Sequence, residues 1–145
     1  MTESRRPSSN RSRPAAFRRT RADHQTELAE DYVELIADLV DERGEARGTD
    51  IAERLGVSNA TVVKTLRRLQ DEDLIRQEPY RAVFLTDAGR KMAVEGRRRH
   101  KIVESFLVAL GVKPDVARID AEGLEHHVSP DTLEAMERFL KSRNT

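Results

Sequence analysis

The stretch GTDIAERLGVSNATVVKTLRRLQDEDLI, residues 48–75, decides the fold. Thr49 stands where it could cap a short helix, and Gly56 then favours a turn. Ser58 follows as the expected N-cap of a second helix, which would extend to about Gln70. A short helix, a glycine-containing turn and a second helix are typical of a helix-turn-helix.

Two short segments after these helices predict a β-hairpin. Residues 74–78 (LIRQE) and 82–86 (AVFLT) are interpreted as two short strands, and Pro79-Tyr80-Arg81 between them favours a turn. A hairpin at this place would form the wing of a winged helix. We therefore expect residues 26–96 to form a winged helix-turn-helix DNA-binding domain.

Helical patterns flank this region on both sides. From about Thr26, apolar residues recur at the spacing of one helix face. A long helix is expected after Asp87-Ala88-Gly89, to about Leu110, and Pro114 and Pro130 stand where the first turns of two further helices would begin. The expected fold class is mainly α, with the winged helix-turn-helix followed by a helical domain over 97–145.

Charge is distributed very unevenly, although the formal net charge is +0. Residues 1–22 hold seven arginines and one glutamate, whereas residues 23–42 hold eight acids and no lysine or arginine. Residues 1–25 also contain little apolar surface to offset the entropy of ordering, so we expect them to form a disordered, arginine-rich arm. That arm could add phosphate affinity or only solubility, and the sequence leaves both roles open.

Length and composition exclude several classes of protein. A chain of 145 residues is short for a large catalytic architecture. It has neither an apolar run of about 20 residues nor the order of a secretory signal, so we expect a cytoplasmic protein without membrane contact. Because there is no cysteine, disulfides and thiolate metal sites are excluded, and any metal must be held by His, Asp or Glu.

The helix-turn-helix predicts a partner, double-stranded promoter DNA. Side chains at the start of its second helix enter the major groove, where each base pair has a distinct pattern of donors and acceptors. Here these residues are Ser58, Asn59, Ala60 and Thr61. The cations that suit phosphate contacts are Lys64, Arg67 and Arg68 along the helix and Arg81 in the wing. Taken alone, the three cations of the helix could equally form a solvated face.

Acids and histidines recur at spacings that suit metal binding. Glu122, Glu125 and His126 lie on one face if the segment is helical, because residues three and four apart are neighbours on a helix. Asp31 and Glu34 have the same relation on the first helix, and a third helix could bring His100 beside them. Each group has a simpler explanation as solvated acids or, for His100 with Glu104, a surface pair. His24 and His127 are interpreted as non-ligands.

Four carboxylates and two imidazoles without sulfur form a hard ligand set that suits Mn²⁺. Two other functions stay open at this point. A small metallohydrolase would need an open coordination position and a substrate pocket, for which the sequence offers no segment, so we expect no enzyme and no small-molecule substrate. A winged-helix regulator that senses Fe²⁺ or an organic ligand is the second alternative.

In its motifs the sequence resembles the manganese-transport-regulator (MntR-type) branch of the diphtheria-toxin-repressor (DtxR) family of metal-dependent repressors. The likeness covers about residues 26–140. Its most specific pieces are EDYVELIADLV, GEARGTDIAERLGVSNATVVKTLRRL, YRAVFLTDAG, RRRHKIVESFL and DAEGLEHHVS.

The resemblance implies a manganese-dependent repressor of manganese-uptake genes. It assigns metal binding to Asp31, Glu34, His100, Glu122, Glu125 and His126, with two Mn²⁺ positions per subunit bridged by Glu122 and Glu125. It further implies a homodimer, so that residues 97–145 would be a metal-binding and dimerisation domain. The operator sequence is not determined, because the residues at Asn59-Ala60 vary among relatives.

Overall fold

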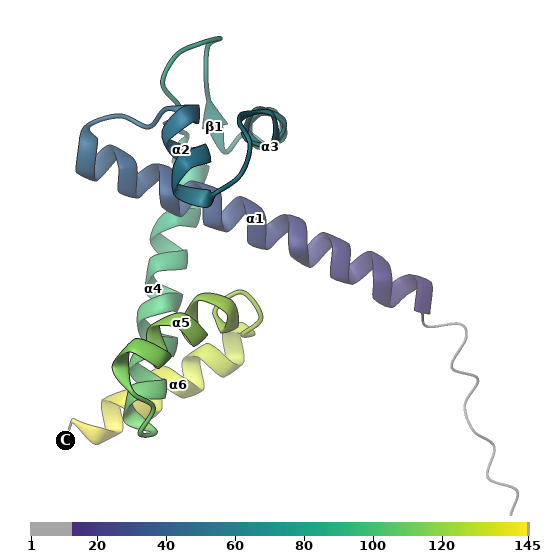
Figure 1. The fold of residues 1–145 in the computed structure, drawn as a ribbon. Helices are drawn as coiled ribbons and strands as arrows, with labels where there is room; N and C mark the ends of the chain where they lie inside the picture. Colours follow the sequence, from purple (N-terminus) through teal and green to yellow (C-terminus); the bar gives the residue numbers. More distant parts are fainter. Residues whose placement is uncertain (1–12, 145) are drawn as a thin grey trace, which may run out of the picture.

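Six helices and a small antiparallel sheet make up the described part of the chain (Figure 1). The structure is a computed structural model that describes the backbone from Arg13 to Asn144 and the side chains from His24 onward. In chain order the elements are α1 (Arg13–Arg43), α2 (Gly48–Leu55), α3 (Asn59–Asp71), β1 (Ile75–Arg76), β2 (Phe84–Leu85), α4 (Asp87–Ala109), α5 (Pro114–Leu124) and α6 (Pro130–Arg143). The expected fold class, a winged helix-turn-helix followed by helices, is confirmed.

Helix α1 starts earlier than its apolar periodicity predicts. The structure begins the helix at Arg13 instead of about Thr26, so the expectation of a disordered arm is wrong for residues 13–25. Alanine and arginine are strong helix formers, Pro14 suits the first turn, and a helix already stabilised by packing gains one hydrogen bond with each added residue. The remainder of the expected arm, residues 1–12, lies outside the described residues.

The helix-turn-helix is fixed by its turn and caps. Gly56 adopts the left-handed conformation (φ 68°) that ends α2. Ser58 caps α3 as expected, since its side chain accepts a hydrogen bond from the backbone N–H of Thr61. Thr49 is not the N-cap of α2, because that helix starts at Gly48, two residues earlier than expected, with Arg47 as its N-cap and no side-chain hydrogen bond there.

The wing is a short hairpin. Ile75 pairs with Leu85, and the strands are shorter than the two expected runs because the chain between them turns away after Arg76. Tyr80 lies in the left-handed region (φ 62°) and is almost wholly exposed. At the base of the wing, Gly89 of α4 allows a close approach, because a Cβ there would lie 2.1 Å from the carbonyl oxygen of Leu74.

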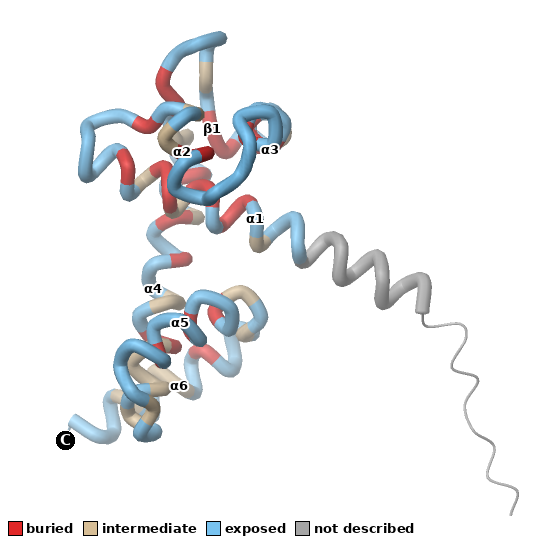
Figure 2. Tube along the Cα trace, in the orientation of Figure 1, coloured by how far each residue is buried: buried red, intermediate tan, exposed pale blue. Residues whose placement is uncertain are grey.

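Two buried clusters are joined by α4. The larger is built on α1, where Tyr32, Ile36 and Leu39 pack among the buried residues of α2, α3 and the wing (Figure 2). The smaller is formed by α4, α5 and α6 around Val103 and Leu133. Helix α4 runs from the first cluster to the second and contacts α1 on its way (Figure 1). None of the helices in the described part is both long and apolar enough to cross a bilayer.

Candidate metal centre

Side chains from three segments meet where α1 passes the second half of the chain. The centre of this cluster is His126, which follows the end of α5 and whose side chain is only 2% exposed. Its Nε2 lies 3.0 Å from Asp31 Oδ1, on α1, and 3.5 Å from Glu125 Oε1. His100, on α4, places Nδ1 3.2 Å from Glu125 Oε2. These contacts join α1 to α4 and to the segment after α5.

Two carboxylates of the cluster lie in a strained electrostatic environment. Burial, together with the neighbouring charge of Asp31, raises the pKa of Glu34 to about 7. Burial and the charge of Glu34 likewise raise the pKa of Glu125 to about 8. Glu34 Oε1 and Glu125 Oε2 are buried without a hydrogen-bond partner among the described residues, although Glu125 Oε2 lies 3.2 Å from His100 Nδ1. Such a group of acids is stabilised by a cation.

The structure adds two residues that the sequence reasoning missed, Glu30 and Arg99. Glu30 Oε2 accepts a 2.6 Å hydrogen bond from His126 Nδ1 and lies 2.9 Å from Nη2 of Arg99. Burial alone would raise the pKa of Glu30, but the hydrogen bond from His126 and the charge of Arg99 hold it below its ordinary value. Burial alone would lower the pKa of His126, but hydrogen bonds to Asp31 and Glu30 raise it to about 10.

Five of the six predicted ligands therefore lie together: Asp31, Glu34, His100, Glu125 and His126. Glu122 lies one turn before His126 on α5 and is exposed. Among the described residues, its side chain is in no ion pair, hydrogen bond or ligand group of the cluster. The structure thus does not join Glu122 to the other five.

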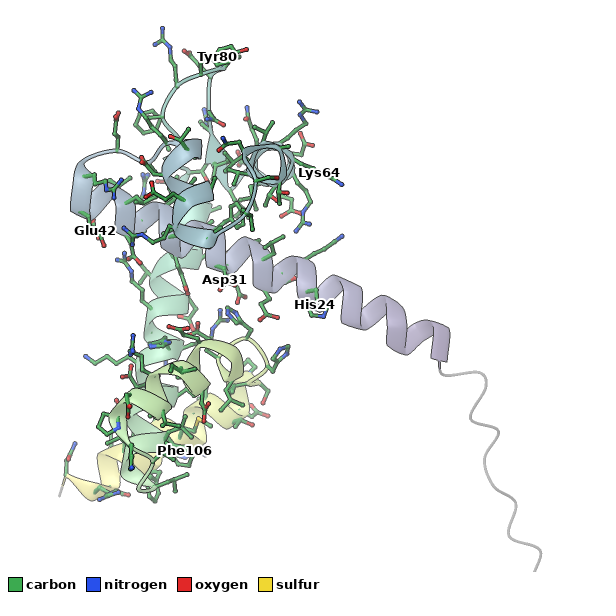
Figure 3. All side chains as sticks on the ribbon, viewed as in Figure 1. His24, Asp31, Glu42, Lys64, Tyr80 and Phe106 are labelled. Atoms are coloured by element: carbon green, nitrogen blue, oxygen red, sulfur yellow. The ribbon has the colours of Figure 1, made fainter. Side chains whose placement is uncertain are left out.

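A further carboxylate, Glu27, lies at the outer edge of the cluster. Donor atoms of Glu27, Asp31 and His126 lie within 4.8 Å of one another, as do those of a second group, Asp31, Glu34 and Glu125. His127 Nε2 lies 3.6 Å from Glu27 Oε2, and His24 Nδ1 lies 4.0 Å from it. Glu27 was not among the residues predicted from the sequence, although its i, i+4 spacing from Asp31 places the two acids on one face of α1. Figure 3 labels His24 and Asp31 on this helix.

The donor set fits a hard divalent cation. It offers carboxylate oxygens and imidazole nitrogens without sulfur, the ligands that suit Mn²⁺ among the first-row metals. In the described part of the chain, two buried carboxylate oxygens without hydrogen-bond partners would supply the negative charge that such an ion neutralises. The groups come from α1 on one side and from α4 and the α5–α6 connection on the other, so a bound cation would fasten these segments together.

The close approach of α4 to Glu34 predicts that Gly96→Ala weakens metal binding without altering any ligand. A Cβ at Gly96 would lie 1.7 Å from Glu34 Oε1, so the flexible carboxylate must move while the backbone can stay. We expect Mn²⁺ affinity to fall roughly tenfold, the lower end of the range for perturbed metal-site partners. Competition with a fluorescent chelator measures the change.

Gly123→Ala is the matched control, because a Cβ there meets nothing within 4 Å although it lies beside the site. We expect this variant to bind Mn²⁺ like the unchanged protein and to be slightly more stable, since alanine is the better helix former. Equal affinities in the two variants would contradict the role of the Glu34 position.

The predicted DNA-reading residues form a separate surface. Asn59 and Arg67 of α3 line a groove whose opposite wall is the wing, with Tyr80 and Arg81. Lys64 is exposed on α3 and projects outward from the winged helix-turn-helix (Figure 3). Ala60 is exposed there as well.

Other predicted contacts of α3 are already engaged within the protein. The side-chain oxygens of Ser58 and Thr61 lie 2.9 Å apart and share a hydrogen bond at the start of the helix. Arg68 donates a 2.8 Å hydrogen bond to the backbone oxygen of Gln25 on α1, and its Nε donates to Glu72. Lys64 and Arg67 are therefore the cations of α3 that are exposed for phosphate contacts.

Family models match almost the whole described chain. The N-terminal DNA-binding domain of iron-dependent repressors matches residues 24–83, and their metal-binding and dimerisation domain matches residues 86–145. Among curated proteins, a transcriptional regulator MntR of Escherichia coli O6:H1 is 58% identical over 125 residues, which cover 86% of this chain and 81% of the relative. The corresponding regulator of Salmonella typhimurium is 55% identical over 129 residues, covering 89% of this chain and 82% of the relative.

Solved structures show the same arrangement. A manganese-dependent transcriptional repressor in complex with manganese is 35% identical, with a TM-score of 0.70 over 78% of this chain. The manganese regulator SloR is 32% identical, with a TM-score of 0.68 over 78% of this chain. The chain spans about half the length of these solved proteins, 52% and 53% respectively.

Proposed function

This chain belongs to the iron-dependent repressor (DtxR) family of metal-dependent DNA-binding regulators, and from its likeness to the MntR branch we propose that it represses manganese-uptake genes when Mn²⁺ is bound. It is a transcriptional regulator and not an enzyme. The observation that carries the proposal is the convergence of Asp31, Glu125 and His126 between α1 and the end of α5.

Two findings favour manganese over other effectors. The similar proteins are MntR regulators and a manganese-dependent repressor, so a regulator that senses an organic ligand is not favoured. The chain also has no cysteine, and its clustered donors are oxygen and nitrogen, which favours Mn²⁺ over softer metals through ligand type.

We further propose two cation positions per subunit. The two oxygens of Glu125 face different imidazoles: Oε1 lies 3.5 Å from His126 Nε2, and Oε2 lies 3.2 Å from His100 Nδ1. A carboxylate placed in this way can bridge two ions. Glu122 would complete the set by turning toward its neighbours one turn along α5. A count of Mn²⁺ bound at saturation tests this number.

A cation bound in the cluster would hold the DNA-binding domain and the dimerisation domain in one relative orientation. Asp31 and Glu34 belong to α1, whose buried face is part of the core of the winged helix, proposed as residues 26–96. His100 and Glu125 belong to the proposed metal-binding and dimerisation domain, residues 97–145. A bound cation supplies the positive charge that offsets the repulsion among these carboxylates. Holding both sides would fix the orientation of the reader.

The second half of the chain carries surface suited to a partner subunit. Large apolar side chains are exposed on the α4–α6 unit: Val108, Leu110, Val116, Ile119 and Phe139. A homodimer would cover such a surface and place two readers on two half-sites of promoter DNA, as helix-turn-helix dimers do.

Removing the metal is predicted to weaken operator binding by about 5- to 150-fold, the range of an allosteric coupling of 1 to 3 kcal/mol. The reason is that a cation favours the DNA-competent state only if it binds more tightly to the arrangement in which α1 is held to α4 and the α5–α6 connection. The measurement is binding of chelator-stripped protein to its own upstream promoter DNA during a Mn²⁺ titration, at one stated salt concentration, because phosphate contacts make affinity salt-dependent.

Operator binding that is equally tight in chelator and in Mn²⁺ would contradict the proposed metal dependence while leaving the DNA reader intact. A Mg²⁺ titration over the same range is the control for general effects of divalent ions on DNA.

A further inference from the structure

We propose that Glu30, anchored by Arg99, is a positioning residue that aims Nε2 of His126 at the cation. This inference rests on the proposed metal-dependent function. His126 Nδ1 lies 2.6 Å from Glu30 Oε2, whereas Nε2, on the opposite side of the ring, lies 3.0 Å from Asp31 Oδ1 and 3.5 Å from Glu125 Oε1. The ring thus spans from one carboxylate to the ligand cluster.

Glu30 is buried, with 7% of its surface exposed, and it is held from two directions. Its Oε2 lies 2.6 Å from His126 Nδ1 and 2.9 Å from Arg99 Nη2. Because α4 contributes Arg99 and the α5–α6 connection contributes His126, this carboxylate joins the three segments that also carry the ligands. An ion pair in such a position fixes the carboxylate in one place.

The consequence for metal binding follows from imidazole chemistry. A neutral imidazole carries its proton on one nitrogen and offers a lone pair on the other, and the hydrogen bond at one nitrogen decides which is which. Without metal, both ring nitrogens of His126 face carboxylates, Nδ1 toward Glu30 and Nε2 toward Asp31. When a cation takes the place of the Nε2 proton, the hydrogen bond to Glu30 would keep the remaining proton on Nδ1 and leave the Nε2 lone pair for the cation. Carboxylates in this role orient ligand histidines, and their loss costs roughly 10- to 100-fold in metal affinity.

Glu30→Gln tests the proposal with nearly unchanged side-chain volume. An amide can donate a hydrogen to Nδ1, which would stabilise the wrong tautomer, and it cannot pair with the charge of Arg99. We expect Mn²⁺ affinity, measured by chelator competition, to fall roughly 10- to 100-fold. Glu137→Gln is the matched control, because Glu137 pairs with Arg98 on the surface, next in sequence to Arg99. Unchanged affinity in a folded Glu30→Gln protein would overturn the proposal.

A measurement on the unchanged protein decides the matter if Glu30→Gln fails to fold. In protein loaded with Cd²⁺ as a diamagnetic probe, ¹⁵N NMR should show cadmium on Nε2 of His126 and a proton on Nδ1. Cadmium bound to Nδ1, or no metal on either nitrogen of His126 while the other sites are filled, would overturn the assignment.

Failure of the proposed function and failure of the Glu30 role would give different results. If the unchanged protein binds neither Mn²⁺ nor Cd²⁺, the proposed function fails. If it binds both metals normally and Glu30→Gln does so equally well, only the positioning role of Glu30 fails.

Discussion

The double variant Glu125→Ala, His126→Ala should lose the response of operator binding to Mn²⁺. Both side chains are almost completely buried, and His126 Nε2 lies 3.0 Å from Asp31 Oδ1 across the junction between α1 and the end of α5. Removing them leaves α1 without its main contacts to the cluster. We expect Mn²⁺ affinity to fall by more than about 100-fold, because loss of a residue that only hydrogen-bonds to a metal ligand already lowers affinity by up to about 100-fold.

Two controls separate this effect from unfolding. The helical content of the variant, measured by circular dichroism, should match that of the metal-free protein, and its non-specific DNA binding should persist. Glu134→Ala removes an exposed acid on α6 that lies 4.0 Å from Arg138, and it should respond to Mn²⁺ normally. A double variant that still tightens on operator DNA when Mn²⁺ is added would contradict the assigned site.

The second large effect is expected at the DNA surface, where Asn59→Ala should reduce sequence discrimination. Asn59 is the first residue of α3 and lines the groove beside the wing, so its amide is placed to contact a base edge. An amide that bonds two positions of one base contributes about 1 to 3 kcal/mol of discrimination against the wrong base. Competition between operator and single-substitution operators measures the change.

Lys64→Ala provides the contrast on the same helix. Lys64 is exposed five residues after Asn59, about one and a half turns further along α3, and suits a phosphate contact, which carries no sequence information. This variant should bind all sequences more weakly and lower the slope of log affinity against log salt by about 1. If Asn59→Ala lowered the affinity for operator DNA and for random DNA equally, Asn59 would be assigned to a contact with the DNA phosphate backbone instead of a base.

Much of the fold could be predicted because local signals agree with one another. Ser58 caps α3, and Pro114 and Pro130 begin α5 and α6 as their positions predict. The predicted start of α1, about Thr26, was wrong. The prediction relied on an apolar stripe, and the arginine- and alanine-rich segment before Thr26 has a helix-forming composition without such a stripe. The helix from Arg13 continues one that packing has already stabilised.

The metal site was harder to predict from the sequence than the fold, because the burial of a side chain depends on how distant segments cross. Glu30 stands beside Asp31 in the sequence and reads as one more solvated acid, yet α4 covers it and Arg99 pairs with it. The close approach at Gly96 is equally invisible in a linear pattern, since it needs α4 to pass against Glu34. Spacing on one helix indicated the ligands, whereas their partners depended on the crossing of α1 and α4.

We propose that the cluster at His126 couples cation binding to DNA binding, and coupling of this kind is reciprocal. The most direct measurement is therefore the Mn²⁺ affinity of the protein with and without saturating operator DNA, at one fixed salt concentration. Operator DNA should tighten Mn²⁺ binding by the same factor, about 5- to 150-fold, by which Mn²⁺ tightens operator binding. Identical Mn²⁺ affinities in the two conditions would contradict the account, because a metal that binds both states equally cannot control the reader.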